Sequence, residues 1–403
     1  MRTIYYLSKR RLILILVALV LLISLVKGIY FGRYLPAGSD YKKIESYPTL
    51  IYLPEYTSGP PIEASAAVLV EAVSGMILYA KNEHSRRAPA STTKILTAVV
   101  TLEVGDLREV VTVSRQAAAT GGSSLWLKTG DRMLLSELLK GTLLRSGNDG
   151  CVAIAQHIAG TEKAFVELMN RKAKEIGALN TNFRNTHGLR APSHYTTAFD
   201  LAQITRYAMH NPEFAKIVST KEEMIEWHEG KRTAVVRNTN KLLWSFAGAD
   251  GVKTGTTNEA GHCLVASATR DGRKFIAVVL NSPNRWSEAS RLLEYGFNHF
   301  SLHLLAKADQ PVTQIRIPTG YPAQVQVYPR KNLMAVLPVG KEGFAQRTVS
   351  LDPQIIVPPV RPGTVVGKVS FCYKGEEVDA VDLLILDRIE KDTWWHRLWR
   401  RAR

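Results

Sequence analysis

The sequence predicts an α/β (α+β) protein, in which a domain with an antiparallel sheet and a helical subdomain is followed by a small all-β domain. Two apolar hairpin patterns predict the sheet: one spans 67–79 and turns at Gly75, and the other spans 262–280 and turns at Asp271-Gly272. Helical patterns fill the sequence between these hairpins. Helices inserted between the strands of one sheet indicate an α/β domain.

The N-terminus carries a membrane signal. Basic residues precede an apolar run from Leu12 to Val26 that is broken only by Ser24, and no Ala-x-Ala cleavage site follows. We therefore expect residues 1–34 to be an uncleaved signal anchor, with a signal peptide as the alternative. Positive charge before the run keeps the N-terminus in the cytoplasm and exports the rest of the chain. The proline-rich stretch 35–62 is predicted to be a linker.

The middle of the chain is helical by its pattern. Apolar periodicity predicts three helices, and a capping box at Thr197-x-x-Asp200 begins a fourth that runs to about His210. The three periodic helices cover 134–144, 149–158 and 164–176.

The character of the sequence changes after about residue 306. Short β-like runs alternate there with proline, glycine and charged residues, and none carries a chemical motif. These runs are 314–317, 323–328, 334–337, 365–371 and 381–386. We therefore expect one domain over 63–307, which holds the motifs described below, and a small β domain over 308–388.

The last residues, 389–403, form an amphipathic pattern. At 100° per residue, three tryptophans fall on one arc and the arginines fall on the opposite one. Such a helix suits the plane of an anionic membrane surface, and packing against a domain is the alternative. The residues on the two arcs include Trp394, Trp395 and Trp399, and Arg397, Arg400, Arg401 and Arg403.

Composition narrows the function classes. The 403-residue chain has a net charge of +16, which admits nucleic acid as a partner. An exported protein beside anionic lipid accounts for the charge better, so nucleic-acid binding is not expected. The three cysteines are far apart and odd in number, which does not indicate a disulfide framework.

A candidate active site begins at Ser91-x-x-Lys94. Pro89 can set the backbone just before a helix, and apolar residues follow Lys94. If the helix begins near Ser91, the serine and the lysine share a face. A serine needs an adjacent base to be a nucleophile, and a lysine whose pKa is lowered by burial can be that base. Ser-x-x-Lys alone is common, so further motifs must decide.

Two further motifs follow in order. Ser146-Gly147-Asn148 lies between two predicted helices, where side chains can point into a cleft, and Lys253-Thr254-Gly255 lies just before the second hairpin, on a strand at or near the sheet edge. Ser-x-x-Lys, Ser-x-Asn and Lys-Thr-Gly in this order are the signature of penicillin-binding proteins and serine β-lactamases.

The chemistry of these residue types assigns the catalytic roles. Ser91 would attack a carbonyl while Lys94 accepts its proton. Ser146 would relay a proton to the leaving amine, with Lys94 or Lys253 assisting. The Ser91 N–H is one candidate donor to the oxyanion, and the Thr256 N–H is the other.

The remaining predicted residues would bind substrate. The Asn148 amide can hold a peptide group, while Lys253 and Thr254 offer a cation and a hydroxyl to a terminal carboxylate. Gly255 lets the backbone come close. A site that binds a free carboxylate beside an acylating serine is a carboxypeptidase site.

The sequence resembles the low-molecular-mass penicillin-binding proteins of the D-alanyl-D-alanine carboxypeptidase type. The resemblance covers about 63–388 and extends to the C-terminal helix. It implies a β-lactamase/transpeptidase-like fold, removal of the terminal D-Ala from peptidoglycan stem pentapeptides through an acyl-enzyme, and covalent capture by β-lactam antibiotics. It also implies a place at the extracytoplasmic face of the bacterial cell membrane. The matching stretches are 89–94, 124–149, 185–202 and 238–268.

Other functions remain open from the sequence. D,D-endopeptidase action on cross-linked peptidoglycan would use the same residues. A serine β-lactamase of class A would need a glutamate that activates water, and Glu167 lies in an amphipathic helix, where we expect it to be a surface residue. A non-catalytic wall-peptide binding module would not need every catalytic position filled. His187 and His194 are the only hint of a zinc peptidase, and their spacing does not suit a metal pair, so neither metal nor cofactor is expected.

Overall fold

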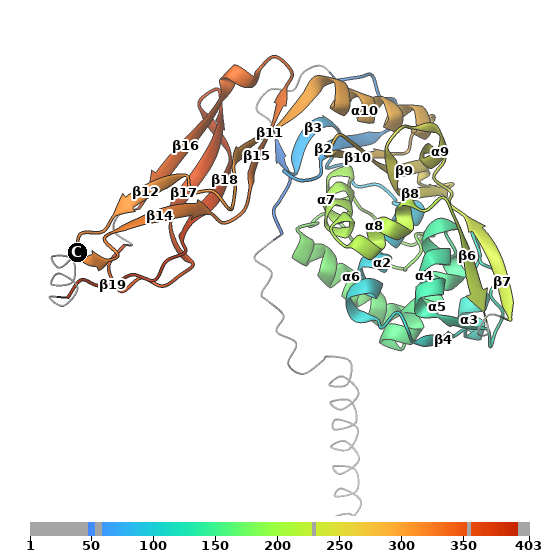
Figure 1. Ribbon diagram of the computed structural model, residues 1–403. Helices are drawn as coiled ribbons and strands as arrows, with labels where there is room; N and C mark the ends of the chain where they lie inside the picture. Colours follow the sequence, from blue (N-terminus) through green and yellow to red (C-terminus); the bar gives the residue numbers. More distant parts are fainter. Residues whose placement is uncertain (1–46, 53–58, 228–230, 353–355, 394–403) are drawn as a thin grey trace, which may run out of the picture. The chain divides into compact units, whose positions relative to one another are not determined.

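A computed structural model describes residues 47–52, 59–227, 231–352 and 356–393 (Figure 1). The predicted anchor, 1–34, and most of the predicted C-terminal helix lie outside the described residues. Glu390–Lys391, at the start of that predicted helix, form strand β19 instead. Within the described ranges, no helix is both long and apolar enough to cross a bilayer.

A six-stranded sheet forms the centre of the catalytic unit, with strand order β1-β3-β2-β10-β9-β8 (Figure 1). Both predicted hairpins are confirmed, because β2 pairs antiparallel with β3, and β9 pairs with β10 across Asp271-Gly272. The strands are β1 (Ile51–Tyr52), β2 (Ala66–Glu71), β3 (Met76–Lys81), β8 (Ala249–Thr257), β9 (Gly261–Arg270) and β10 (Arg273–Leu280).

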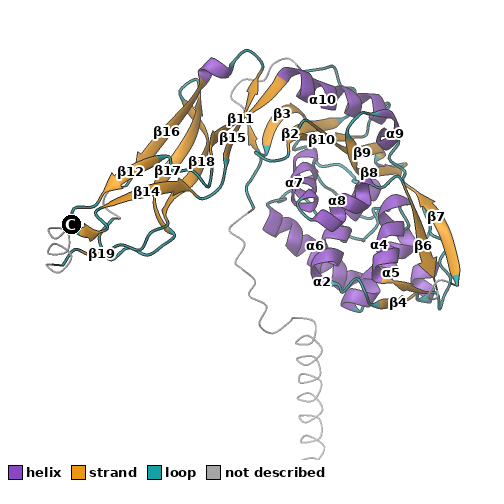
Figure 2. Cartoon of the chain, in the orientation of Figure 1, coloured by secondary structure: helices purple, strands orange, loops and turns teal. Residues whose placement is uncertain are grey.

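Both faces of this sheet are buried, which explains its continuous apolar strands. Alternate residues of β2 point to opposite faces: Val68 and Val70 belong to the core that the helical subdomain covers, while Ala67 and Leu69 pack in the core under α10 (Figure 2). Part of the predicted linker also packs here, since β1 pairs parallel with β3.

The predicted helices are confirmed within a few residues, and their ends follow local chemistry. Thr161 caps α6 by accepting from Ala164 N, and Gly177, with φ of 90°, ends it. The helices are α2 (Lys94–Val104), α3 (Arg115–Ala118), α4 (Leu135–Leu144), α5 (Asn148–Ala159), α6 (Glu162–Ile176), α7 (Ala198–Met209), α8 (Pro212–Ser219), α9 (Leu242–Ser245) and α10 (Arg285–His299).

The capping box predicted at the start of α7 forms only in part. The Thr197 hydroxyl accepts from Asp200 N at 3.0 Å, as predicted. The Asp200 carboxylate accepts from Asn180 N and Thr181 Oγ1, and so ties α7 to the preceding loop. Helix α8 was not predicted, although Asn211 caps it and Pro212 occupies its first turn.

Two small two-stranded sheets of the catalytic unit were not predicted from the sequence. In β6 only Ile225 and Trp227 are buried, which is the alternation of a half-buried strand. Three of its six residues are glutamates, so the apolar pattern in the sequence is too short to predict the strand. The first sheet pairs β4 (Val110–Thr112) with β5 (Arg132–Leu134) across a connection that contains α3, and the second is a hairpin of β6 (Glu222–Trp227) and β7 (Arg232–Arg237).

The segment after α10 is built from strands, and all five predicted runs fall on them. Strand β11 begins at Phe300, before the predicted boundary at 308, and β16 was missed because its side chains are mostly polar and exposed. One sheet has the order β12-β14-β18-β17-β16, while β11 pairs with β15 and β13 with β19. The strands are β11 (Phe300–Ala306), β12 (Thr313–Arg316), β13 (Gly320–Tyr321), β14 (Gln324–Pro329), β15 (Leu333–Pro338), β16 (Ala345–Leu351), β17 (Thr364–Tyr373) and β18 (Glu376–Ile385).

Candidate active site

Ser91 lies in a 3₁₀ turn, η1 (Ala90–Thr93), that leads directly into α2. The Thr92 and Thr93 hydroxyls donate to the carbonyls of Pro89 and Ala90, at 2.6 and 2.9 Å, and hold this turn closed. The first eight residues of α2, beginning with Lys94, are all buried. The predicted helix start near Ser91 is therefore confirmed, with a tighter first turn, and Ser91 is fixed at the end of an embedded helix.

Lys94 Nζ makes three hydrogen bonds. It donates to Ser91 Oγ at 3.0 Å, to Asn148 Oδ1 at 2.7 Å and to the carbonyl oxygen of His187 at 2.9 Å. The first two partners are the serine and the asparagine of two separate predicted motifs. The structure therefore brings Ser91, Lys94 and Asn148 into direct contact.

The Asn148 amide has a defined orientation. Its Nδ2 donates to the carbonyl of Gly121 at 2.7 Å, and because that carbonyl can only accept, Oδ1 must face Lys94. The His187 carbonyl is likewise only an acceptor. An uncharged lysine would donate its two protons to these two oxygens, so its lone pair would be directed at Ser91 Oγ.

The electrostatics of the site favour uncharged lysines. Lys94 is fully buried, and loss of solvation lowers its pKa below the usual 10.5. Burial lowers the pKa of Lys253 well below its ordinary value, and the positive charges of Lys94 and Arg285 lower it further. A charge on Lys94 therefore favours the uncharged form of Lys253.

Ser146 follows α4 and precedes α5 with a φ of 69°, a left-handed conformation that is uncommon outside glycine. Its Oγ is buried, and no atom of the described residues makes a hydrogen bond to it. Asn148 N donates to Ser123 O at 2.7 Å, and this bond ties the motif to a neighbouring loop. The structure places Ser146 beside Asn148 in the chain, and its hydroxyl retains a free hydrogen-bonding capacity.

Asp149 organises that neighbouring loop and was not a predicted site residue. Its buried carboxylate accepts bonds from Ser124 Oγ, from the backbone N–H groups of Leu125 and Leu127, and from its own neighbour Gly150. The only feature of the sequence that could have indicated its importance is its position directly after Ser146-Gly147-Asn148. The effect of these bonds is to fix the loop against the start of α5, next to Asn148.

Lys253, Thr254, Gly255 and Thr256 lie on β8, which is the last strand of the sheet, as predicted. Lys253 Nζ donates to the Thr254 carbonyl at 3.1 Å, and the Thr254 hydroxyl lies 2.7 Å from that of Thr239. Lys253 and Thr254 are buried, whereas Thr256 is exposed. The strand therefore carries its cation below the surface and its last threonine at the surface.

Two glycines allow the segments around Ser91 to approach one another. A Cβ on Gly255 would lie 3.0 Å from both Ser91 N and Ala90 Cβ, so only glycine lets β8 run this close to η1. Gly188 has a φ of 91°, and a Cβ there would lie 1.8 Å from the Ala90 carbonyl oxygen. Both close approaches converge on the turn that carries Ser91, as predicted for Gly255.

Arg285 is a second residue that the sequence analysis missed. Its Nη1 donates to Gly255 O at 2.8 Å and to Thr256 Oγ1 at 2.7 Å, so a half-buried guanidinium lies beside the end of β8. It is the first residue of α10, and no local motif marks it. Only the pairing of β8, β9 and β10 brings it to the site.

His187 and His194 hold local structure. His194 Nε2 lies 3.1 Å from Thr93 Oγ1, and His194 Nδ1 accepts from Arg184 N. In the part of the chain that the structure describes, no three metal-binding side chains gather. Glu167 is exposed on α6, as expected. The three cysteines are free, with Cys151 and Cys263 buried and Cys372 half-buried.

Comparison with known proteins identifies the family. A family model described as D-alanyl-D-alanine carboxypeptidase matches residues 54–284, which is more than half of the chain. The chain belongs to this family. A second model, for the C-terminal domain of penicillin-binding protein 5, matches residues 300–391. The resemblance inferred from the sequence is thereby confirmed, and the protein is a serine hydrolase of the D-alanyl-D-alanine carboxypeptidase family.

Relatives support the same conclusion. A D-alanyl-D-alanine carboxypeptidase of Bacillus subtilis is 34% identical over 78% of this chain and 82% of its own length. One of Escherichia coli is 33% identical over 91% of this chain and 94% of its own length. The crystal structure of penicillin-binding protein 5 from Haemophilus influenzae has a TM-score of 0.75 at 31% identity, and covers 83% of this chain and all of that one. The predicted fold class is confirmed, with a catalytic domain followed by an all-β domain.

Proposed function

We propose that this protein removes the terminal D-Ala from peptidoglycan stem pentapeptides through an acyl-enzyme on Ser91. One observation carries the proposal: Lys94 Nζ lies 3.0 Å from Ser91 Oγ, and its other two partners can only accept hydrogen bonds. Membership of the D-alanyl-D-alanine carboxypeptidase family supports the choice of substrate. β-Lactam antibiotics would acylate the same serine.

Acylation begins when Ser91 Oγ attacks the carbonyl carbon of the penultimate D-Ala and its proton passes to Lys94 Nζ. Burial lowers the pKa of Lys94 from its usual 10.5, which increases the share of the amine that is uncharged and can act as the base. The oxyanion that forms would accept hydrogen bonds from the backbone N–H groups of Ser91 and Thr256. Gly255 supports this arrangement, because its lack of a side chain allows β8 to approach Ser91 N.

Collapse of this intermediate breaks the bond to the terminal D-Ala, whose nitrogen must take up a proton. Ser146 Oγ would relay that proton, assisted by Lys94 or Lys253. The buried Ser146 hydroxyl makes no hydrogen bond within the described residues, so it can bond to the leaving amine. Water then attacks the acyl-enzyme, releases the shortened peptide and restores Ser91.

The terminal carboxylate of the substrate would bind at β8. Lys253 contributes an amine N–H donor from below the surface, Thr254 contributes a hydroxyl, and Arg285 adds a guanidinium beside Thr256. Asn148 Nδ2 would hold a peptide group of the substrate. The Arg285 guanidinium and these donors favour a free carboxylate on the residue that leaves, which is the terminal D-Ala of a stem pentapeptide.

We also propose an extracytoplasmic location. A wall-peptide substrate requires export, and the apolar run within residues 1–34 supports anchoring there. The tryptophans and arginines of 389–403 support additional contact with an anionic membrane surface. In this proposal 63–307 is the catalytic domain, 35–62 is a linker, and 308–388 is a β domain between the catalytic domain and the membrane-binding helix.

The test is release of D-alanine by the full-length protein, purified in detergent, from an acetylated peptide ending in Lys-D-Ala-D-Ala. We expect release that vanishes in Ser91→Ala, together with fluorescent penicillin labelling that is lost in the same variant. Penicillin labelling without D-alanine release would favour the endopeptidase, to be tested with cross-linked peptide dimers. Rapid penicillin turnover would favour a β-lactamase. Neither labelling nor release would contradict the catalytic proposal and favour a binding module.

A further inference from the structure

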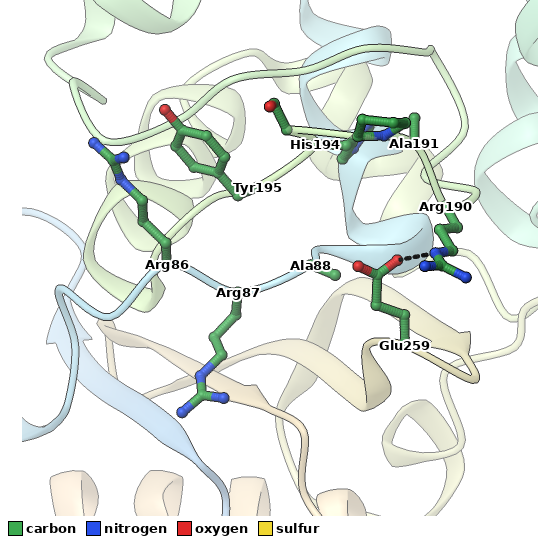
Figure 3. Close-up of a pocket in the computed structure, with 10 residues that line it drawn as sticks. Arg86, Arg87, Ala88, Arg190, Ala191, His194, Tyr195 and Glu259 are labelled. Atoms are coloured by element: carbon green, nitrogen blue, oxygen red, sulfur yellow. Dashed lines mark ion pairs between the residues drawn. The ribbon is translucent and has the colours of Figure 1, made fainter.

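A groove lies next to the segment that leads to Ser91 and has no part in the chemistry proposed above. It has a volume of about 680 Å³ and lies between residues 86–88, the loop 190–195 and Glu259. Figure 3 shows Arg86 and Tyr195 at one end and Arg190 and Glu259 facing each other at the other. Backbone hydrogen bonds hold the two chain segments of the groove together, because Arg87 and Thr196 donate to each other's carbonyls at 2.8 and 2.9 Å.

The groove is positively charged. Three arginines, Arg86, Arg87 and Arg190, line it against one carboxylate, that of Glu259. His194 also lines the groove, and burial lowers its pKa to about 4, so it is uncharged at neutral pH. The excess is therefore two positive charges in a recess, where charges are screened less than on a flat surface.

The arginines retain binding capacity. Arg190 and Glu259 are 3.6 Å apart, and the Arg190 side chain is 84% exposed, so this pair is weak and leaves donors available. The Arg86 guanidinium stacks on Tyr195 at 4.5 Å and its Nη2 donates to Asn180 Oδ1 at 3.3 Å, so the group is held in place with its remaining N–H donors available to an anion. Arg87 Nε is buried and makes no hydrogen bond to any described residue.

The groove starts close to the reacting centre. Ala88 in its wall precedes Ser91 by three residues, and Glu259 follows Thr256 by three residues. Three residues of extended chain span at most about 11 Å. A peptide acylated on Ser91 through its penultimate D-Ala would therefore reach the groove with the residue two positions upstream.

We propose that this groove binds a free carboxylate on the stem peptide, two residues upstream of the penultimate D-Ala. The inference rests on the proposed function, because it concerns substrate held at Ser91. A stem peptide that carries this carboxylate is anionic outside the scissile end, and arginines suit carboxylates through paired N–H donors. The protein would thus prefer the acidic form of its substrate over the same peptide with an amidated side group.

Two synthetic peptides test this. One is acetyl-L-Ala-γ-D-Glu-L-Lys(acetyl)-D-Ala-D-Ala, and the other carries a carboxamide in place of the free carboxylate of D-Glu. For the full-length protein at low ionic strength, we expect kcat/KM to be about five- to tenfold higher for the carboxylate peptide, and we expect high salt to reduce this ratio. A ratio within about twofold of one at low salt would overturn the inference.

Variants of the groove residues test whether the groove causes the preference for the carboxylate peptide. Arg86→Gln combined with Arg190→Gln should bring the ratio close to one, while kcat/KM for the carboxamide peptide stays unchanged and reports an intact fold. Glu259→Gln should raise the ratio, because it removes the one carboxylate among the described residues that line the groove. Arg115→Gln, at an exposed arginine outside the groove, is the matched control and should leave the ratio unchanged.

The outcomes separate the two proposals. Failure to release D-alanine from either peptide would contradict the proposed function itself. Release from both peptides at equal rates, or a carboxylate preference that persists in the double arginine variant, would contradict only the groove assignment.

Discussion

The hydroxyl groups of Thr239 and Thr254 lie 2.7 Å apart. Thr239 also donates its backbone N–H to the carbonyl of Leu144 at 3.0 Å, at the end of α4 and two residues before Ser146. One residue therefore links the strand that carries Lys253 and Thr254 to the helix end that precedes Ser146. It is a positioning residue, because it holds Thr254 in the orientation that we propose for carboxylate binding.

Thr239→Val should weaken substrate binding more than the chemical step. Loss of the hydroxyl that orients Thr254 should weaken the binding free energy of the substrate by about 1 kcal/mol. We therefore expect KM to rise about fivefold with little change in kcat. Steady-state kinetics on a peptide ending in D-Ala-D-Ala measure this. Thr239→Ser should restore the wild-type KM, and Thr112→Val, at an exposed site on β4, is the control. A fall in kcat alone would contradict the positioning role.

Acylation should accelerate as pH rises. Lys94 must lose its proton to act as a base, and burial lowers its pKa from the usual 10.5, so the rate should rise through that lowered pKa and level off below pH 10.5. The second-order rate constant for benzylpenicillin, measured from pH 5 to 10, tests this. A rate that falls with rising pH over this range would argue against Lys94 as the base.

Gly255→Ala should disrupt the approach of β8 to η1. The added methyl group would lie 3.0 Å from Ser91 N and 3.1 Å from the Pro89 carbonyl oxygen, and both contacts are backbone atoms that cannot rotate away. We expect penicillin acylation to fall at least about tenfold, a change of about 1.4 kcal/mol in the barrier. Gly343→Ala is the matched control, since its Cβ would meet nothing within 4 Å.

Asp149→Asn should damage both stability and activity. The buried carboxylate accepts several N–H and O–H bonds, and an amide would turn a donor toward at least one of those donors. We expect the free energy of unfolding to fall by about 2–3 kcal/mol and penicillin labelling to slow, because Asn148 is adjacent. Denaturant unfolding and labelling rates measure the two effects. Unchanged stability would show that the loop does not depend on this carboxylate.

The parts of the site that depend on local spacing could be predicted from sequence. Ser91 and Lys94 are one helical turn apart, so their contact follows from the helix, and a glycine beside a basic residue and a threonine on a strand indicates close approach at Gly255. Contacts between distant segments could not be predicted in this way. Arg285 reaches Gly255 only through the folded hairpin of β9 and β10, and the His187 partner of Lys94 is a backbone carbonyl, which no side-chain pattern shows.

The same distinction applies to the fold. Strands β9 and β10 are buried on both faces, so apolar runs marked them clearly. Strand β16 lies at the edge of its sheet with exposed polar residues, and therefore carries no apolar signal. Helix α8 was missed because Asn211-Pro212 was interpreted only as the end of α7, although the same two residues begin the next helix.

The position of β8 at the end of its sheet has a consequence for solubility. An edge strand offers its free backbone groups to any extended chain, so it can template aggregation as readily as it can receive a peptide as an added strand. The proposed binding of substrate at β8 would use this edge. On β8 the carbonyls of Thr254 and Gly255 already accept hydrogen bonds from Lys253 and Arg285, which leaves fewer groups for pairing between two copies of the strand. Replacing Lys253 or Arg285 with valine would therefore free these carbonyls and favour aggregation as well as impair catalysis.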